Sequence, residues 1–347
     1  MTVAGNGLVV GVDTHLYVHV AVVLDRLGRR LAVREFTATD AGNAAMAGWL
    51  ARLGQVTDAG VEGTGSYGYR LARLLAGRSI QVWEINCPDR SRRRRRGKSD
   101  PVDAENAARA VLAGEATAIP KDRRGFVGEL RLLVLTRRNA VKARTQASNQ
   151  IKAFLLDAGD EVRARLRPLR KAAFGRACAA LEPDNAVHRA IATLGRRWLA
   201  LNTEARELEK QMIALLSAHA PALLARHGVG PMTAAQLLVT AGGNPQRLHG
   251  DAALAALCGA SPIEASSGKT SRHRLNRGGD RAANNALWVI ANVRLGSDPR
   301  TQAFLAKRTA TGNSRKEIMR MLQRYIAREL YPLIINALRP EISVGLT

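Results

Sequence analysis

The stretch VVGVDTH, residues 9–15, decides the fold of the N-terminal third, because an apolar run ends there in a single acid, Asp13. Two alternating, β-branched segments follow it at residues 17–24 and 31–36, and the turn-like sequence DRLGRR joins them. Runs of this kind, separated by a polar turn, are typical of consecutive strands. The sequence therefore begins with three predicted strands.

Helical and strand-like patterns alternate after these strands. The sequence predicts a helix over residues 41–53, a strand over 56–62, a helix over 69–76 and a strand over 80–86. Three strands followed by helix–strand–helix–strand–helix is the element order of an RNase H-like fold. We therefore expect an α/β domain of this type at the N-terminus.

Four acids occupy the places where that fold carries its acidic residues: the first strand, the end of the fourth and a later helix. They are Asp13, Glu62 in GVEGTGSYG, and Asp100 and Asp103 in KSDPVDAENAAR. Strand ends bring distant residues together, and two aspartates three apart at a helix start point the same way. Because clustered carboxylates repel one another unless a divalent cation neutralises them, the sequence predicts a metal site.

The chain is strongly basic, with 53 Lys and Arg against 29 Asp and Glu and a net charge of +24. Its expected partner is therefore a polyanion, bound with a steep dependence on salt. Residues 90–98, RSRRRRRGK, hold seven basic residues in nine, and so dense a run is either a solvated linker or lies on phosphates. Its place directly before Asp100 favours nucleic-acid contact by Arg92, Arg93, Arg94, Arg95, Arg96 and Lys98.

Several classes of protein are disfavoured by composition. Only three cysteines occur, widely spaced and without a CxxC pair, so neither a disulfide framework nor a zinc site is expected. The first residues do not read as a secretory signal, and no apolar run approaches the length of a membrane helix. We expect a cytoplasmic protein that acts on nucleic acid and has no membrane partner.

Residues 127–226 have an almost wholly helical pattern. Two interleaved series of apolar residues at seven-residue spacing predict a coiled-coil seam in the second part of this region. They are Val187, Leu194, Leu201, Leu208 and Leu215, and Ile191, Trp198, Ala205 and Met212. With a weaker partner segment at 127–156, two long helices that turn around residues 159–183 are expected to form an antiparallel arm. The arm serves dimerisation or packs only within the chain.

The final third begins with RHGVGPMTAAQLL, residues 226–238, which is typical of a helix, a Gly-Val-Gly turn and a second helix. Glycines let the backbone approach a phosphate closely, and the N–H groups of a helix start can hold it. We interpret Gly228 and Gly230 as nucleic-acid contacts in a helix-hairpin-helix-like element. A short helix at 251–257 is expected next.

A basic loop around the sequence Ser-Ser-Gly at 266–268 supplies a candidate nucleophile, Ser267. A serine is a weak nucleophile until a base or metal takes its proton and cations hold the phosphoryl oxygens. From the pattern alone, a serine in such a loop is more often a turn residue than a nucleophile, and His273 fits a phosphate contact better than a base. The cations expected to contact nucleic acid here are Lys269, Arg272, Arg274 and Arg277.

Taken in order, these segments resemble the DEDD transposases of the insertion-sequence one-ten type, the bridge-RNA-guided recombinases. The resemblance covers nearly the whole chain and depends on seven motifs in the family's order. They are VGVDTH, VEGTGSYG, INCPDR, KSDPVDA, HGVGPMTAAQLL, LAALCGASPIEASSGK and LNRGGDRAANNAL. Cys87, within INCPDR, is a small departure from the family pattern.

The resemblance implies three domains: a RuvC/RNase H-like DEDD domain at 1–120, a helical coiled-coil domain at 121–222, and a C-terminal serine transposase domain at 223–347. It assigns catalysis to Asp13, Glu62, Asp100 and Asp103, which hold Mg²⁺, two ions per site, and to Ser267, with Ser266 adjacent. It also implies double-stranded donor and target DNA, a structured non-coding guide RNA, and a dimer or tetramer in the bacterial cytoplasm, associated with the nucleoid when active.

The sequence thus predicts a transposase that exchanges DNA strands through a covalent phosphoserine. The alternative is a metal-dependent endonuclease of the Holliday-junction type, which activates water and forms no covalent intermediate. A non-catalytic nucleic-acid-binding scaffold is a third interpretation, and the presence of all four acids argues against it.

Overall fold

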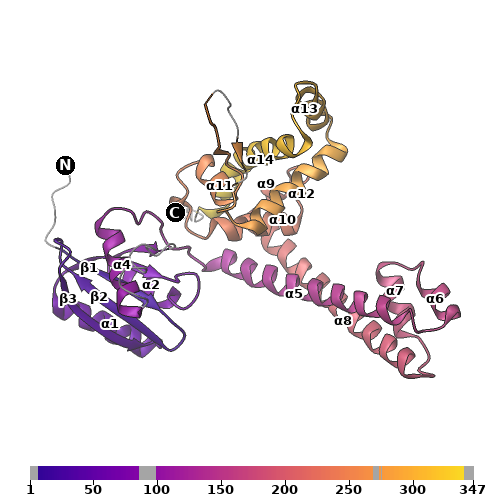
Figure 1. Ribbon diagram of the computed structural model, residues 1–347, viewed down its shortest axis with the longest axis horizontal. Helices are drawn as coiled ribbons and strands as arrows, with labels where there is room; N and C mark the ends of the chain where they lie inside the picture. Colours follow the sequence, from indigo (N-terminus) through magenta and orange to yellow (C-terminus); the bar gives the residue numbers. More distant parts are fainter. Residues whose placement is uncertain (1–6, 86–98, 269–272, 275, 340–347) are drawn as a thin grey trace, which may run out of the picture. The chain divides into compact units, whose positions relative to one another are not determined.

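The computed structural model describes residues 7–85, 99–268, 273–274 and 276–339. The chain divides into two compact units, residues 1–121 and 122–347, and each is described by itself. Unit 1 is a mixed α/β structure and unit 2 is almost entirely helical (Figure 1). The expected combination of an N-terminal α/β part with a mostly helical remainder is therefore confirmed.

Unit 1 contains a five-stranded sheet in the order β3-β2-β1-β4-β5. The first three strands pair antiparallel, while β4 runs parallel to β1 and β5 parallel to β4. Every strand and helix expected before residue 86 is present, within a few residues of its predicted ends. The elements are β1 (Leu8–Thr14), β2 (Val18–Leu24), β3 (Arg30–Thr37), α1 (Asp40–Leu53), β4 (Val56–Glu62), α2 (Tyr69–Ala76), β5 (Gln81–Ile85) and α4 (Asp100–Leu112).

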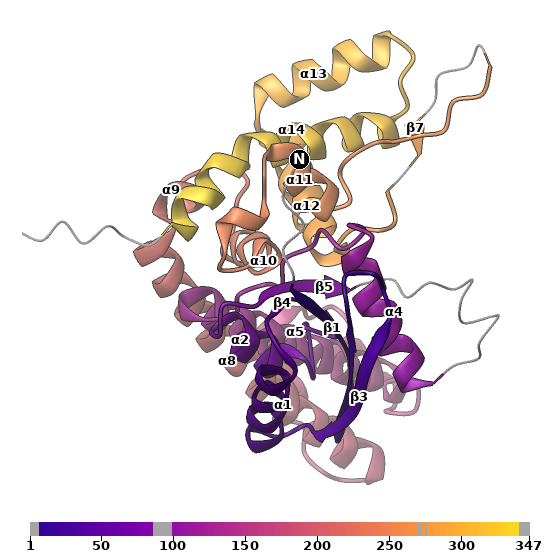
Figure 2. The ribbon, with the colours of Figure 1, turned by 90° about the vertical axis from the view of Figure 1, so that its left-hand side faces the viewer.

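Helices cover both faces of this sheet, as Figure 2 shows. One face packs Val10, Val12 and Val61 against α1 and α2 in an apolar core. The other face packs Val9 and its neighbours on β2 against α4. Because side chains alternate along a strand, β1 contributes every second residue to each core.

Two glycines let α4 lie unusually close to the sheet. A Cβ atom on Gly11 would overlap the backbone of Ala104 and Ala108, and one on Gly60 would lie 2.6 Å from the carbonyl oxygen of Ala107. These alanines are buried, so small residues face small residues across the contact. The close approach fixes where the first turn of α4 lies relative to the end of β1.

Unit 2 is built on a long antiparallel helix pair, α5 (Gly125–Phe154) and α8 (Ala186–His219), with α6 and α7 at one end and the remaining helices at the other (Figure 1). The elements between and after the pair are α6 (Asp160–Leu166), α7 (Lys171–Ala179), α9 (Pro221–Leu224), α10 (Pro231–Ala241), the 3₁₀ turn η1 (Pro245–Arg247), α11 (Asp251–Leu257), β6 (Ile263–Glu264), β7 (His273–Arg274), α12 (Arg281–Ser297), α13 (Pro299–Ala310) and α14 (Arg315–Leu338).

The two heptad series on α8 have different environments. Ile191, Trp198, Ala205 and Met212 are all buried, whereas the series that begins at Val187 is only partly buried. The seam against α5 therefore follows one predicted series, and the other lies at its edge. That this pair is a coiled coil remains a prediction, as does a domain boundary at 222.

The segment between the two long helices forms α6 and α7, where the sequence suggested only a turn. Leu166, Phe174 and Cys178 from these short helices pack with Ile151 of α5 and Ile191 of α8. The apolar side chains explain why the segment folds back onto the pair.

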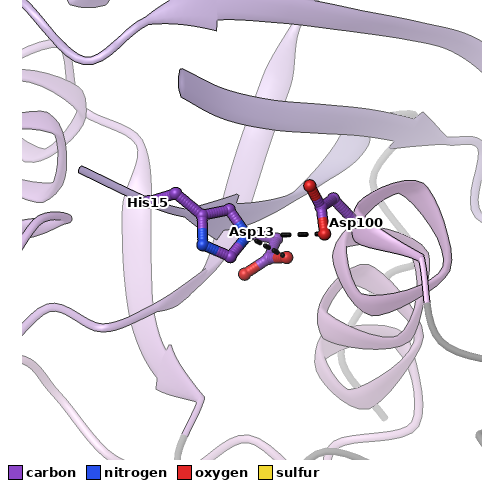
Figure 3. Close-up of side chains that lie close together, drawn as sticks. All are labelled: Asp13, His15 and Asp100. Atoms are coloured by element: carbon purple, nitrogen blue, oxygen red, sulfur yellow. Dashed lines mark hydrogen bonds and ion pairs between the residues drawn. The ribbon is translucent and has the colours of Figure 1, made fainter. Parts of the chain in front are cut away.

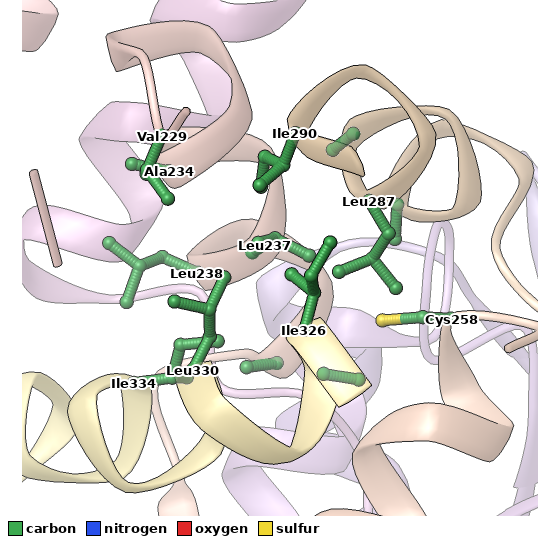
Figure 4. Packing of buried hydrophobic residues seen from close by; sticks show 14 of the residues in the cluster. Val229, Ala234, Leu237, Leu238, Cys258, Leu287, Ile290, Ile326, Leu330 and Ile334 are labelled. Carbon is green, nitrogen blue, oxygen red and sulfur yellow. The ribbon is translucent and has the colours of Figure 1, made fainter. Parts of the chain in front are cut away.

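The largest core lies at the other end of the pair. There α10 contacts α5, α8, α12 and α14, and its Leu237 and Leu238 belong to one apolar cluster with Ile290, Ile326 and Leu330 (Figure 4). No helix among the described residues is both long and apolar enough to cross a membrane.

Candidate active site

Asp13, His15 and Asp100 lie together where β1 ends beside the start of α4 (Figure 3). His15 Nε2 is 3.0 Å from Asp13 Oδ2 and 3.5 Å from Asp100 Oδ1. Asp13 is buried, whereas the side chains of His15 and Asp100 are half exposed. The group therefore has a buried carboxylate at its base and opens to solvent through the other two side chains.

The position of this group follows from the packing of α4. Asp13 is two residues after Gly11 on β1, so its side chain leaves the same face of the sheet, toward α4. Asp100 is the first residue of α4, whose close approach over Gly11 brings its first turn to the strand end. Two residues 87 positions apart thus meet because two glycines leave no side chain between helix and sheet.

Glu62 ends β4, the parallel neighbour of β1, and stands two residues after Gly60. By the alternation of the strand it also leaves the sheet on the α4 face. The Thr14 hydroxyl donates to the Glu62 carbonyl oxygen at 2.9 Å, which ties the two strand ends together. Glu62 is not part of the group formed by Asp13, His15 and Asp100.

Asp103 lies one turn along α4 from Asp100 and is almost fully buried. An acid in the first turn of a helix is stabilised by the helix dipole, and both aspartates occupy such positions. Like Glu62, Asp103 lies outside the three-residue group. The structure thus brings together two of the four predicted acids, while Glu62 lies on the neighbouring strand β4 and Asp103 on the same helix as Asp100.

The donor atoms of the group are suited to a divalent cation. Carboxylate oxygens are the ligands that Mg²⁺ and Mn²⁺ prefer, and the imidazole of His15 adds a donor that suits transition metals such as Fe²⁺ or Zn²⁺. The ligand atoms of Asp13, His15 and Asp100 all lie within 4.8 Å of one another, so one ion has room to contact all three. The residues present therefore fit a divalent metal.

His15 was not among the site residues predicted from the sequence. A histidine two residues after an acid has no distinctive spacing, and only the approach of α4 reveals that the ring reaches both aspartates. The available signal was its place directly after the strand that carries Asp13.

The second predicted site, around Ser267, belongs to unit 2. The strands β6 and β7 pair as a short antiparallel hairpin, and β7 stands out from the helices in Figure 2. Ser266 and Ser267 are both exposed, and Gly268 has a φ of +55°, a left-handed conformation that favours glycine. The serine hydroxyls are therefore presented on a turn and are not part of a core.

Basic side chains from two elements face a cavity of about 690 Å³ beside this hairpin. Arg274 comes from β7, and Arg320 and Arg324 from α14. Arg324 also donates to Asp251 at 2.8 Å, and this hydrogen bond lowers the pKa of the Asp251 carboxyl. Arg277 is exposed on the loop that follows the hairpin.

Asp280 anchors the end of this loop. Its Oδ1 accepts from the amides of Ala282 and Ala283 at the start of α12, and its Oδ2 accepts from the Thr240 hydroxyl at 2.7 Å. The Asp280 amide also donates to the Leu257 carbonyl. The basic loop is therefore held to α10, α11 and α12 at its C-terminal end.

Packing within unit 2 accounts for the glycine turn at 228–230. Gly228 has a φ of +79°, and a Cβ atom there would lie 3.1 Å from the Ile290 carbonyl oxygen on α12. The amide of Gly230, the N-cap of α10, donates to the Thr233 hydroxyl at 3.0 Å. A nucleic-acid contact at Gly228 and Gly230 stays a prediction, and the helix before the turn has only four residues.

Several predicted contact residues lie outside the described residues. They are Arg92, Arg93, Arg94, Arg95, Arg96, Lys98, Lys269 and Arg272.

Two parts of the chain match family models of transposases. Residues 10–159 match a family model of IS110-type DEDD proteins described as "Transposase". Residues 220–306 match a second model, described as "Transposase IS116/IS110/IS902 family".

A curated relative is the "Insertion element IS110 uncharacterized 43.6 kDa protein" of Streptomyces coelicolor. The two chains are 32% identical over 151 residues, which is 42% of this chain and 36% of the relative. The match thus spans about a third of the relative's length.

Proposed function

The chain belongs to the IS110 family of insertion-sequence transposases, and on that premise we propose that it exchanges DNA strands for an insertion sequence. The observation that carries the proposal is the convergence of Asp13 and Asp100, with His15, at the edge of the sheet. In this proposal unit 1 is RNase H/RuvC-like, which its strand order β3-β2-β1-β4-β5 supports.

The four acids are proposed to act as one metal site. Asp13, Glu62, Asp100 and Asp103 would hold Mg²⁺, two ions per site, with Glu62 at the end of the neighbouring strand β4 and Asp103 on the same helix as Asp100. A bound divalent cation supplies Lewis-acid polarisation of the scissile phosphate and stabilisation of the oxygens that carry charge. The burial of Asp13 supports the assignment, because a buried carboxylate is costly unless it has a partner.

Ser267 is the proposed nucleophile. Its Oγ forms a bond to the phosphorus and the bond from phosphorus to the 3′ oxygen breaks, so that the hydroxyl proton is lost and a 3′ hydroxyl is released. The 3′ hydroxyl of the partner strand then attacks the phosphoserine, restores a phosphodiester and returns the proton to the serine. The exposure of Ser267 on a turn supports this role.

The cations around the hairpin are proposed to neutralise the phosphate. Arg274 is exposed on β7 and Arg277 on the loop that follows it, and Lys269 and Arg272 belong to the same basic loop in the sequence. Positive charges placed to face a developing phosphorane stabilise the transition state, and their effect is larger where bound DNA displaces water from them.

The proposed partners follow from the family and from charge. They are donor and target DNA duplexes and a structured guide RNA that pairs with both, bound by a chain of net charge +24. We also propose a dimer or tetramer in which the α5–α8 pair acts as a coiled-coil arm. Leu132, Leu135 and Ile213, which are exposed on that pair, support such an interface.

The competing function is hydrolysis by a Holliday-junction-type endonuclease. Both functions require the acids, but only strand exchange requires a covalent bond between protein and DNA. The experiment incubates the full chain with divalent cation, copurifying RNA and labelled DNA, and resolves the products on a denaturing gel.

Strand exchange predicts labelled DNA that migrates with the protein and is released by protease. The matched pair Ser267→Ala and Ser266→Ala assigns the nucleophile, because both serines are exposed on the same turn. The adduct should vanish in Ser267→Ala and persist in Ser266→Ala. Cleavage without any adduct in the unsubstituted protein would instead establish hydrolysis.

A further inference from the structure

The far end of the helical arm contains a basic cavity separate from the serine hairpin. It has a volume of about 700 Å³ and lies between the ends of α5 and α8 and the short helices α6 and α7. Figure 1 shows α6 and α7 at the opposite end of the α5–α8 pair from α10, α12 and α14. Nothing in the proposed chemistry uses this cavity.

The cations of the cavity come from three separate elements. Five line it, and no acidic side chain does: Lys152, Arg163, Arg167, Arg170 and Lys171. So many like charges around one concave surface repel one another unless an anion lies among them. Their convergence is a property of the fold, because Lys152 comes from α5 and the others from α6, α7 and the turn between them.

Two of the five cations already have structural partners. Arg163 pairs with Asp160, one turn earlier on α6. Arg170 donates to the carbonyl oxygens of Arg167 and Leu169 at 2.6 and 2.9 Å, so it holds the turn between α6 and α7. In the part of the chain that the structure describes, Lys152, Arg167 and Lys171 form no ion pair.

The floor of the cavity is held by a hydrogen bond and by apolar packing. Trp198 Nε1 donates to the Ser148 hydroxyl at 2.8 Å, which links α8 to α5 beneath the cations. Phe174 and Leu155 complete an apolar base, and both are buried. A preorganised floor means that a ligand does not have to order the site when it binds.

The backbone at Lys171 is also unusual. It has a φ of +52°, which is rare for a residue with a side chain and costs free energy that the surrounding structure must offset. This conformation occurs where the turn after Arg170 becomes helix α7, at the rim of the cavity.

We propose that this cavity binds the sugar-phosphate backbone of a nucleic-acid strand, a second contact remote from the serine hairpin. The charge favours a polyanion over a single small anion, because three cations without acidic partners face one cavity in a chain of net charge +24. Phosphate contacts of this kind position a strand without reading its sequence. The inference depends on the proposed function in one respect: the proposed function identifies the polyanion as a nucleic acid.

The direct test is protection of lysines in the full chain. The protein is treated with an amine-acylating ester, with and without a short single-stranded RNA, the DNA strand of the same sequence or its duplex, and acylation is measured by mass spectrometry. Lys152 and Lys171 should react more slowly when nucleic acid is bound. Lys210, exposed on α8 and paired with Glu207, is the internal control.

A charge-matched pair of triple variants tests the cavity energetically. One triple variant, Lys152→Gln with Arg167→Gln and Lys171→Gln, removes the cations without acidic partners. The control triple, Arg165→Gln with Arg176→Gln and Arg206→Gln, removes three exposed charges on α6, α7 and α8 that do not line the cavity. The slope of log K against log salt should fall by about 2 for single strands or about 2.7 for duplex DNA in the first triple only. Circular dichroism checks that both fold.

The possible outcomes separate this inference from the proposed function. Equal loss of slope in both triples, or equal acylation of Lys152 and Lys171 with and without nucleic acid, would overturn it. The serine adduct is read independently, so Ser267→Ala should lose the adduct while Lys152 and Lys171 stay protected. Protection by RNA alone, or by DNA alone, identifies the strand that occupies the cavity.

Discussion

The closeness of α4 to the sheet can be tested with a graded series of alanine substitutions. A Cβ atom on Gly11 would overlap the backbone of Ala104 and Ala108, and neither backbone can move without the whole helix. A Cβ atom on Gly60 would lie 2.6 Å from the Ala107 carbonyl oxygen, where real Cβ atoms rarely come within 3.0 Å. Gly11→Ala therefore demands the larger retreat of α4.

Overpacking of this kind lowers the free energy of unfolding by about 1–3 kcal/mol. We expect a loss near the upper end of that range for Gly11→Ala and near the lower end for Gly60→Ala. Gly48→Ala is the matched control, because its Cβ would meet only Arg52 Nη1 at 3.8 Å on helix α1. That substitution should raise the free energy of unfolding by about 0.5–1 kcal/mol, since glycine loses more backbone entropy in a helix. Chemical denaturation measures all three.

The same series should affect catalysis. Retreat of α4 carries Asp100 away from Asp13, and a misplacement of about 1 Å at a reacting centre can cost about 100-fold in rate. The rate of DNA cleavage, measured under conditions where each variant is folded, should be highest in Gly48→Ala, lower in Gly60→Ala and lowest in Gly11→Ala. If Gly11→Ala kept both normal stability and normal cleavage, the packing account of the site would be wrong.

Three further predictions concern single side chains. Asp13→Ala should abolish DNA cleavage. Without divalent cation, its melting temperature should be unchanged or higher, because the substitution removes one of two adjacent acids that repel each other. A lower melting temperature would instead show that Asp13 has a structural role. Trp198→Phe should lower the free energy of unfolding by about 1 kcal/mol through loss of the hydrogen bond to Ser148, and adding Ser148→Ala should cost little more, which denaturation of the double variant checks. The hydrogen bond from Arg324 lowers the pKa of Asp251 below the ordinary aspartate value of 3.8, so the stabilisation by this pair is present above that pH and is lost as the pH falls through the lowered pKa. Asp251→Asn should therefore flatten the acid limb of stability against pH, and an unchanged limb would count against the ion pair.

Local patterns were sufficient for the elements of unit 1. The apolar run before Asp13 became β1, and the predicted order of strands and helices up to residue 85 is the observed one. Strands and helices are set by hydrophobic periodicity and by glycine turns, which act over a few residues. For that reason the placement of Asp13 and Glu62 at strand ends was also predictable.

Side-chain periodicity was less informative where packing selects between equivalent faces. The two heptad series on α8 are alike in the sequence, yet only the series that contains Trp198 is buried. The helices α6 and α7 were missed because their apolar residues, such as Leu166 and Phe174, acquire a partner only when α5 and α8 lie side by side.

The sequence by itself determined the order of the elements, the basic character of the chain and the residue types of both candidate sites, because these depend on local spacing and composition. Only the tertiary structure decided that His15 joins Asp13 and Asp100, and that Lys152 of α5 meets Arg167 and Lys171 at the end of the arm. The physical reason is the same in both cases. Close packing of segments that are distant in the sequence determines which charged groups become neighbours, and the spacing of residues along the chain does not reveal their distance in the folded protein.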